Sequence, residues 1–291
     1  MTIGAKPRIL LSEGSSLSAR EAITALGLAG HAVEVVTSSR LCLGRFSRFV
    51  QRVHRVPASG ADPFSYLSAV LDVVGRRHID VLLPTHEQAY LFAAARHRLP
   101  TGLGVALADF TAFEEVQNKA RFSTLLCRLG VPQPDTQLVS SAREFLTERP
   151  YPFFVKQTFG TASIGVWRVD NKEQRDRLLQ EIEERRDFTE GLLLQAMASG
   201  PLERAQAIFD HGRLVICHAY RQLVEGPGGG DVLKVSVHRP EARELVARIG
   251  SALSWHGAIS FDYVLEGGIG PPQFIDANPW GQEDTKAQSR N

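Results

Sequence analysis

The sequence has 291 residues, 43% of them hydrophobic and 22% charged, which is the composition of a chain that folds in water around its own core. At about 100–200 residues per domain, this length predicts two or three domains. The 33 basic residues nearly balance the 32 acidic ones, and the net charge of +1 excludes the strongly basic surface of a nucleic-acid or membrane-surface binder. Only six of the basic residues are lysines, so each lysine is a candidate for a specific role.

The cysteines and the apolar segments together predict a cytoplasmic protein. Cys42, Cys127 and Cys217 are odd in number and far apart, which fits free thiols in a reducing compartment better than a disulfide framework or a zinc site. The N-terminus lacks the apolar stretch of a signal peptide, and no segment reaches the roughly 18 consecutive apolar residues of a membrane span.

Residues 1–112 alternate between short apolar segments and amphipathic ones. The expected strands are 8–11, 32–37 and 79–83, and the expected helices are 18–29, 63–77 and 88–98. Near-continuous apolar strands that alternate with helices are typical of a parallel sheet covered on both faces, as in a Rossmann-like domain. The turn at 12–18 lacks the G-x-G-x-x-G spacing of a dinucleotide site, which disfavours a nicotinamide-dependent dehydrogenase.

The remaining residues combine hairpins with helices, the pattern of α+β structure. Helices are expected at 118–129, 142–148, 172–186 and 240–255, and strands at 136–139, 152–156, 165–169, 191–195, 202–210, 213–220, 258–265 and 273–277. The strands 202–210 and 213–220 should form a hairpin that turns at Asp210, His211 and Gly212. The stretch 225–231 is expected to be a flexible connection.

Lys156 stands at the end of an apolar strand and precedes a loop of small residues that returns into another strand. Gly160, Ser163 and Gly165 would let backbone N–H groups face an anion, and the ammonium group would add a point charge. The loop is not a Walker A loop, which requires G-x-x-x-x-G-K-[ST] before a helix. An ordinary hairpin would explain the same pattern, so this segment alone does not establish a phosphate site.

Asp262 and Asp276 each stand among apolar neighbours in the last two expected strands. Buried carboxylates are costly unless they are paired or bound to a cation. Residues two apart on a strand share a face, so Asn278 can join both acids on one side. Three such oxygen donors suit Mg²⁺ shared with substrate phosphates. Acids that are hydrogen-bonded at strand ends are the alternative explanation.

Taken in order along the chain, these segments resemble the motifs of the ATP-grasp superfamily, which includes biotin carboxylase, carbamoyl phosphate synthetase and D-alanine–D-alanine ligase. Lys119 and its helix are similar to the family's early phosphate-binding segment, and residues 130–134 (GVPQP) follow it as in many members. Lys156 and the loop to Gly165 resemble the lysine and the glycine-rich lid over the triphosphate. The other matching positions are the adenine hinge residues Gln195, Ala196 and Met197, the ribose position Glu203, and the metal positions Asp262, Asp276 and Asn278.

The resemblance implies a Rossmann-like domain at 1–112, a small ATP-grasp subdomain with the lid at 113–190, and a large subdomain with the metal site at 191–291. The two α+β subdomains would enclose ATP between them. The implied activity is that of a ligase dependent on ATP and Mg²⁺ (or Mn²⁺), in which a carboxylate attacks the γ-phosphate and an amine captures the acyl phosphate. The implied partners are small carboxylates and amines, such as amino acids, and a second copy of the chain in a homodimer.

The resemblance also implies individual roles. Lys119 and Lys156 would bind phosphates, and Asn278 would act in catalysis as well as in metal binding. Arg221 is the candidate for contact with the γ-phosphate or the substrate carboxylate, with a surface arginine as the alternative. Lys234 and the glycines 228–230 would line the substrate entrance, with a plain flexible loop as the alternative.

The sequence departs from the family pattern at three positions. Gln195 stands where many members have an acid, Asp276 replaces the usual glutamate, and Trp280 stands where many members place an arginine. The polar tail 281–291 then ends the sequence earlier than in related chains. These features lead to the expectation of a C-terminally truncated ligase, and to the alternative of a non-catalytic ATP-binding protein with the same fold.

Overall fold

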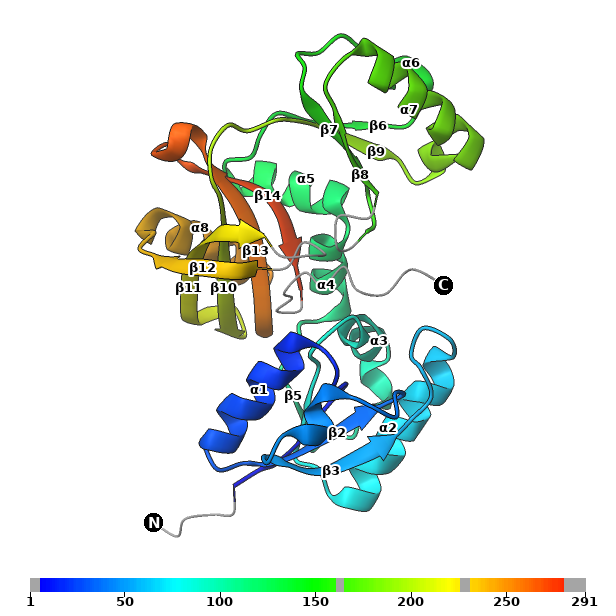
Figure 1. The fold of residues 1–291 in the computed structure, drawn as a ribbon, viewed down its shortest axis with the longest axis vertical. Coiled ribbons are helices and arrows are strands. Elements are labelled where there is room, and N and C mark those ends of the chain that lie inside the picture. The colour runs from blue at the N-terminus through cyan, green and yellow to red at the C-terminus, as the bar shows by residue number, and fades with distance from the viewer. Residues whose placement is uncertain (1–5, 161–164, 226–230, 280–291) are drawn as a thin grey trace.

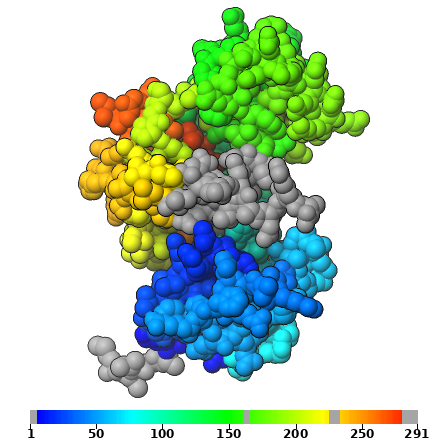
Figure 2. Space-filling view, viewed as in Figure 1, coloured from blue at the N-terminus to red at the C-terminus, as the bar shows by residue number. Residues whose placement is uncertain are grey.

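The computed structural model describes residues 6–160, 165–225 and 231–279. Its strands form three sheets that follow one another along the long axis of the molecule, as Figure 1 shows. The first sheet forms the N-terminal unit. The four-stranded sheet is called the small sheet and the second five-stranded sheet is called the large sheet, and each of them forms one further unit. In the space-filling view the N-terminal unit (blue) lies at one end, the small-sheet unit (green) at the other, and the large-sheet unit (yellow to orange) between them (Figure 2).

The N-terminal unit is a parallel sheet with helices on both faces, as its periodicity predicts. Its strands are β1 (Arg8–Leu11), β2 (Ala32–Thr37), β3 (Val50–Arg55), β4 (Val81–Leu83) and β5 (Gly104–Val105), in the order β3-β2-β1-β4-β5. Its helices are α1 (Leu17–Leu28), α2 (Pro63–Arg77) and α3 (Gln88–Ala94). Alternate residues of β1 face opposite ways: Ile9 packs with Ile23 of α1, whereas Leu10 belongs to the core under α2 and α3.

The small sheet is antiparallel and has its own core. Its strands are β6 (Thr136–Val139), β7 (Phe153–Gln157), β8 (Val166–Val169) and β9 (Leu192–Ala196), in the order β6-β9-β7-β8. The helices α6 (Ala142–Phe145) and α7 (Lys172–Arg185) cover one face, where Phe145, Val155 and Ile182 are buried together. The opposite face of β7 and β9 is therefore left for Lys156 and Leu193, which line a pocket.

The large sheet is also antiparallel, in the order β12-β11-β10-β13-β14. Its strands are β10 (Leu202–Asp210), β11 (Arg213–Glu225), β12 (Asp231–Val237), β13 (Gly257–Leu265) and β14 (Pro272–Asn278). The predicted hairpin between β10 and β11 is confirmed. It turns at His211 and Gly212 with positive φ angles of 47° and 86°, the backbone of a tight hairpin turn. β12 begins at Asp231, the last residue of the stretch expected to be a flexible connection, and was not predicted.

Three helices pack on the large sheet, and the first of them also contacts α3 of the N-terminal unit. They are α4 (Phe110–Gln117), α5 (Lys119–Leu129) and α8 (Pro240–Ala252), and short 3₁₀ turns lie at Leu43–Phe46, Arg96–Arg98, Asp187–Thr189 and Glu266–Gly268. Phe113 of α4 stacks on Trp255 with the ring centres 6.1 Å apart. Phe122 of α5 stacks on Phe261 with the ring centres 6.2 Å apart. The core thus continues from α2 and α3 to the large sheet.

Gly257 marks the closest approach of β13 to the segment between β5 and α4. It has φ +99°, and a Cβ there would lie 2.2 Å from the carbonyl oxygen of Ala106, so no larger residue fits. In the described parts of the chain, no helix has the length and apolar character needed to cross a membrane.

Candidate functional site

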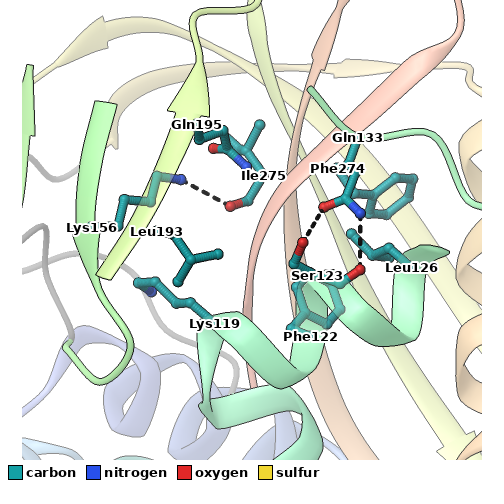
Figure 3. A pocket seen from close by; sticks show the side chains of 10 residues that line it. All are labelled: Lys119, Phe122, Ser123, Leu126, Gln133, Lys156, Leu193, Gln195, Phe274 and Ile275. Atoms are coloured by element: carbon teal, nitrogen blue, oxygen red, sulfur yellow. Dashed lines mark hydrogen bonds between the residues drawn. The ribbon is translucent and has the colours of Figure 1, made fainter. Parts of the chain in front are cut away.

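A narrow pocket lies where α5 and β14 meet the uncovered face of the small sheet (Figure 3). Buried apolar side chains form part of its wall, namely those of Phe122, Leu126, Leu193 and Phe274. Lysines from two separate parts of the chain complete it, one from α5 and one from β7. The pocket therefore offers both an apolar surface and positive charge.

Lys119 occupies the first position of α5 because Asn118 ends α4 and caps α5. The Asn118 side chain accepts hydrogen bonds from the backbone N–H groups of Ala120 and Arg121, at 2.9 and 3.0 Å. The backbone N–H of Lys119 donates to the carbonyl of Thr158 after β7, at 2.8 Å. Its ammonium group donates to both carboxylate oxygens of Asp276, at 2.6 and 2.8 Å. A buried lysine thus links the start of α5 to the large sheet.

Lys156 approaches β14, the strand of Asp276, from the small sheet. Its ammonium group donates to the carbonyl oxygen of Ile275 at 3.0 Å, and Ile275 is the extra residue of a β-bulge between β13 and β14. Burial lowers the pKa of Lys156 to about 8; the charge of Asp276 opposes this effect and the charge of Lys119 adds to it. Lys156 is therefore an ammonium group that is costly to keep charged unless an anion is bound.

Asp262 and Asp276 lie directly opposite each other on β13 and β14, so the structure brings the two predicted metal ligands together. Their side chains are 18% and 25% exposed, so both carboxylates are only partly buried. Asp262 also accepts a hydrogen bond from Nε of Arg204, at 3.1 Å. Asn278 lies two positions further along β14, opposite Ser260. Arg204 was not predicted as a site residue, because its partner is 58 residues away and only the strand register pairs them.

The cluster of Lys119, Lys156, Arg204, Asp262 and Asp276 holds three cations against two acids. It lies in a partly buried region, where charges are weakly screened by salt. Such a surplus of positive charge favours an anion with several oxygens, such as a polyphosphate.

Glu203 was predicted to bind a ribose, and this role stays a prediction. Its carboxylate is fully buried and accepts hydrogen bonds from Arg221 (2.8 and 3.0 Å), Arg239 (2.8 Å to each oxygen) and the Tyr263 hydroxyl (3.1 Å). Burial would raise the pKa of Glu203, but Arg239 and Arg221 outweigh it and hold the pKa below its ordinary value. Both oxygens of Glu203 thus already accept hydrogen bonds from side chains of the protein itself. Arg239 and Tyr263 were not predicted, because they too are far from Glu203 in the sequence.

Arg221 lies on β11, directly opposite Glu203. The Glu203 carboxylate fixes one edge of its guanidinium group, and the side chain is 32% exposed. A contact between Arg221 and a phosphate or a substrate stays a prediction. Lys234, on β12, lies with its ammonium 5.0 Å from the ring centre of Tyr220, in a cation–π contact.

The hinge positions lie at the end of β9. Gln195 is buried and donates through Nε2 to Thr136 Oγ1 at 3.0 Å, while Met197 is 42% exposed. The backbone N–H of Ala196 donates to the carbonyl of Asp135 at 2.8 Å, so this donor is already used within the small sheet. Adenine contacts at these positions stay a prediction.

The lid is described only at its two ends. Gly160 lies just after β7, and Gly165 has φ +75° and accepts a hydrogen bond from the N–H of Gln157 at 2.8 Å. Ser163, Trp280 and the glycines 228–230 lie outside the described residues.

Comparison with known proteins gives the fold. No family model matches the chain. The large chain of carbamoyl phosphate synthase from Thermus thermophilus is 25% identical over 191 residues, which is 61% of this chain but only 18% of that protein. Three solved structures cover 94–96% of the chain. An L-amino acid ligase from Bacillus licheniformis matches with a TM-score of 0.71 at 18% identity, over 67% of its own length.

The second structure is the biotin carboxylase domain of a 2-oxoglutarate carboxylase from Hydrogenobacter thermophilus, solved with MgADP, ADP and bicarbonate. It matches with a TM-score of 0.74 at 18% identity, over 65% of its length. The third is N5-carboxyaminoimidazole synthetase from Staphylococcus aureus, with a TM-score of 0.70 at 14% identity, over 71% of its length. The chain thus has the ATP-grasp fold, as its motifs predict, and spans about two thirds of these solved chains.

Proposed function

We propose that the chain binds ATP together with Mg²⁺ in the pocket between its small and large sheets, and that it is a ligase that joins a carboxylate to an amine. The observation that carries the proposal is the convergence of Lys119 and Lys156 on the cross-strand pair Asp262–Asp276. The matched fold of an L-amino acid ligase, and of a carboxylase domain solved with MgADP, supports it.

The donor set fits a hard divalent cation. Asp262 and Asp276 supply carboxylate oxygens from adjacent strands, and Asn278 adds an amide oxygen two positions along β14. Lys119 holds both oxygens of Asp276 in this structure, so a metal ion at Asp276 requires Lys119 to turn away. Mg²⁺, when bound, would neutralise charge on the phosphates. Mn²⁺ has the same ligand preference.

The chain's own residues would act mainly by holding charge in place. Lys119 and Lys156 would bind phosphate oxygens and stabilise the charge that develops on departing ADP. The buried side chains of Phe122, Leu126 and Phe274 would accept the base and exclude water. A substrate carboxylate would form a bond to the terminal phosphorus while the bond to the ADP oxygen breaks. The amine would then attack the acyl carbon, forming the C–N bond as phosphate leaves, and its proton would pass to solvent.

A second candidate is a protein that binds the nucleotide without catalysing ligation. Arg204 favours it, because a guanidinium group hydrogen-bonded to Asp262 already neutralises one of the two acids needed for the metal. Under this alternative the chain binds ADP or ATP through the two lysines but does not transfer phosphate.

Binding and turnover separate the two candidates. The first measurement is MgADP binding by calorimetry for the wild-type chain and for Lys156→Met, with the exposed Lys172→Met as the matched control. The second is phosphate release from ATP and Mg²⁺ with pools of amino acids as combined carboxylates and amines. The ligase predicts both binding and pool-dependent release. Binding without release from any pool supports the second candidate, and no MgADP binding contradicts both.

A further inference from the structure

Asp210, His211 and His256 form a second cluster at the far end of the large sheet. Asp210 ends β10 six positions beyond Arg204, which places it about 20 Å along the strand from the acid pair. His256 directly precedes β13. The backbone N–H of Gly212 donates to the carbonyl of Trp255 at 2.7 Å, and this bond holds the hairpin turn beside His256.

The two imidazole rings are stacked and nearly parallel, with ring centres 4.1 Å apart and planes inclined by 6°. Nδ1 of His256 is buried, has no hydrogen-bond partner, and lies 3.8 Å from Oδ1 of Asp210. The other oxygen of Asp210 accepts a hydrogen bond from Arg213 at 2.8 Å, which leaves Oδ1 turned toward His256. One ligand atom from each of the three residues lies within 4.8 Å of the other two.

This donor set suits a transition metal better than Mg²⁺ or Ca²⁺. Two imidazole nitrogens and one carboxylate oxygen are the ligands of a zinc site with an open fourth position, whereas Mg²⁺ and Ca²⁺ prefer oxygen alone. Nitrogens bound tetrahedrally to Zn²⁺ lie about 3.3 Å apart. The lone pair of an imidazole lies in its ring plane, so one of the two parallel rings must rotate out of the stack to direct its nitrogen at a shared ion.

The charge state of the cluster also favours a metal. Parallel rings in contact are poorly compatible with two positive charges. Neutral imidazole is the form that binds metal ions. A buried nitrogen without a hydrogen-bond partner is costly, and a metal ion would remove that cost.

We propose that Asp210, His211 and His256 bind one divalent transition-metal ion, with Zn²⁺ as the expected occupant and water at the fourth position. The ion links the β10–β11 turn to the start of β13, where Gly257 packs against Ala106. It therefore joins two segments of the large sheet, next to the contact that Gly257 makes with Ala106. This site is separate from the nucleotide pocket, so the proposal does not depend on the proposed ligase function.

The test measures Zn²⁺ binding to metal-free protein by competition with a chromophoric chelator, in the absence of nucleotide. The variants are His256→Gln and His211→Asn; asparagine tolerates the positive φ of position 211, so this turn remains foldable. The matched control is His218→Gln, an exposed histidine on β11 that is hydrogen-bonded to Ser236. Far-UV circular dichroism verifies that each variant is folded.

The expected result is one Zn²⁺ per wild-type chain, with an affinity at least about tenfold lower in both cluster variants and unchanged in the control. Zn²⁺ should also raise the thermal midpoint of the wild type and not that of the cluster variants. Co²⁺ should give the visible absorption of a four-coordinate site only when both histidines are present. The proposal is overturned if the wild type binds no Zn²⁺, or if either folded cluster variant binds it as tightly as the wild type.

Discussion

Replacing Lys156 by methionine is expected to stabilise the unliganded protein while weakening nucleotide binding. Burial holds the pKa of Lys156 at about 8, below its ordinary value of 10.5, and this difference corresponds to about 3 kcal/mol against the charged form in the folded state. Methionine is close in length and brings no charge. It leaves the Ile275 carbonyl without the donor that lies at 3.0 Å, which costs about 1–2 kcal/mol. The free energy of unfolding should therefore rise by about 1–2 kcal/mol near pH 7.

The same change removes a charged donor from the proposed phosphate site. A hydrogen bond to a charged group contributes about 1.5–3 kcal/mol, so the dissociation constant of MgADP should rise by about 10- to 150-fold. Urea unfolding measures the first effect and calorimetry measures the second, with Lys172→Met as the exposed control for both. A Lys156→Met variant that is less stable than the wild type would refute the burial argument. An unchanged MgADP affinity would refute the assignment of Lys156 to the phosphates.

Three further predictions follow from the charged groups and the helix cap. Because Lys156 loses its proton above about pH 8, MgADP affinity measured between pH 7 and 9.5 should fall by up to about tenfold per pH unit above 8; a flat profile would contradict this. Burial opposes the charge of Glu34, but Arg77 and His54 outweigh it and hold its pKa below the ordinary value, so its stabilisation is present at neutral pH and is lost as pH falls through the lowered pKa. Glu34→Gln should cost about 2 kcal/mol or more in urea unfolding at pH 7 and less at pH 3, whereas an equal cost at both values would exclude this linkage. Asn118→Ala should cost about 1 kcal/mol by the loss of the α5 cap and should weaken MgADP binding through displacement of the adjacent lysine; equal stability by urea unfolding would show that the cap is dispensable.

The fold was largely predictable because most elements have one buried face. The strand Ala32–Thr37, the helix Pro63–Arg77 and the strand Thr136–Val139 have the predicted boundaries. The first two have a clear apolar pattern with a turn or a cap at the start, whereas only Val139 is buried in the third. The missed strand Val50–Arg55 lies at a sheet edge with no fully buried residue, so it lacks the apolar pattern that periodicity detects. The missed strand Asp231–Val237 is also an edge strand, and Leu233 and Val235 are exposed.

The site was predictable where single residues break an apolar pattern. Lys156, Asp262 and Asp276 each stand out from apolar neighbours, and the structure brings all three to the same end of the large sheet. Partners across strands were not predictable, because they depend on the register of segments far apart in sequence. Arg204 and Asp262 are one such pair.

Glu203 is a second residue whose partners across strands could not be predicted from the sequence. A lone acid in a buried strand has the same sequence pattern whether it faces a ligand or a pair of arginines. Only the packing of β10 between β11 and β13 turns it toward Arg221, Arg239 and Tyr263.

The most direct test of the central claim is trapping of the activated carboxylate with hydroxylamine, a small nucleophile that replaces an unidentified amine. The chain is incubated with ATP, Mg²⁺, hydroxylamine and pooled carboxylates, and hydroxamate and phosphate are measured together. The account predicts equal amounts of hydroxamate and phosphate for at least one pool, with neither formed by Lys156→Met and both retained in Lys172→Met. Formation of neither product from any pool, by a chain that still binds MgADP, would contradict the ligase and leave a nucleotide-binding protein.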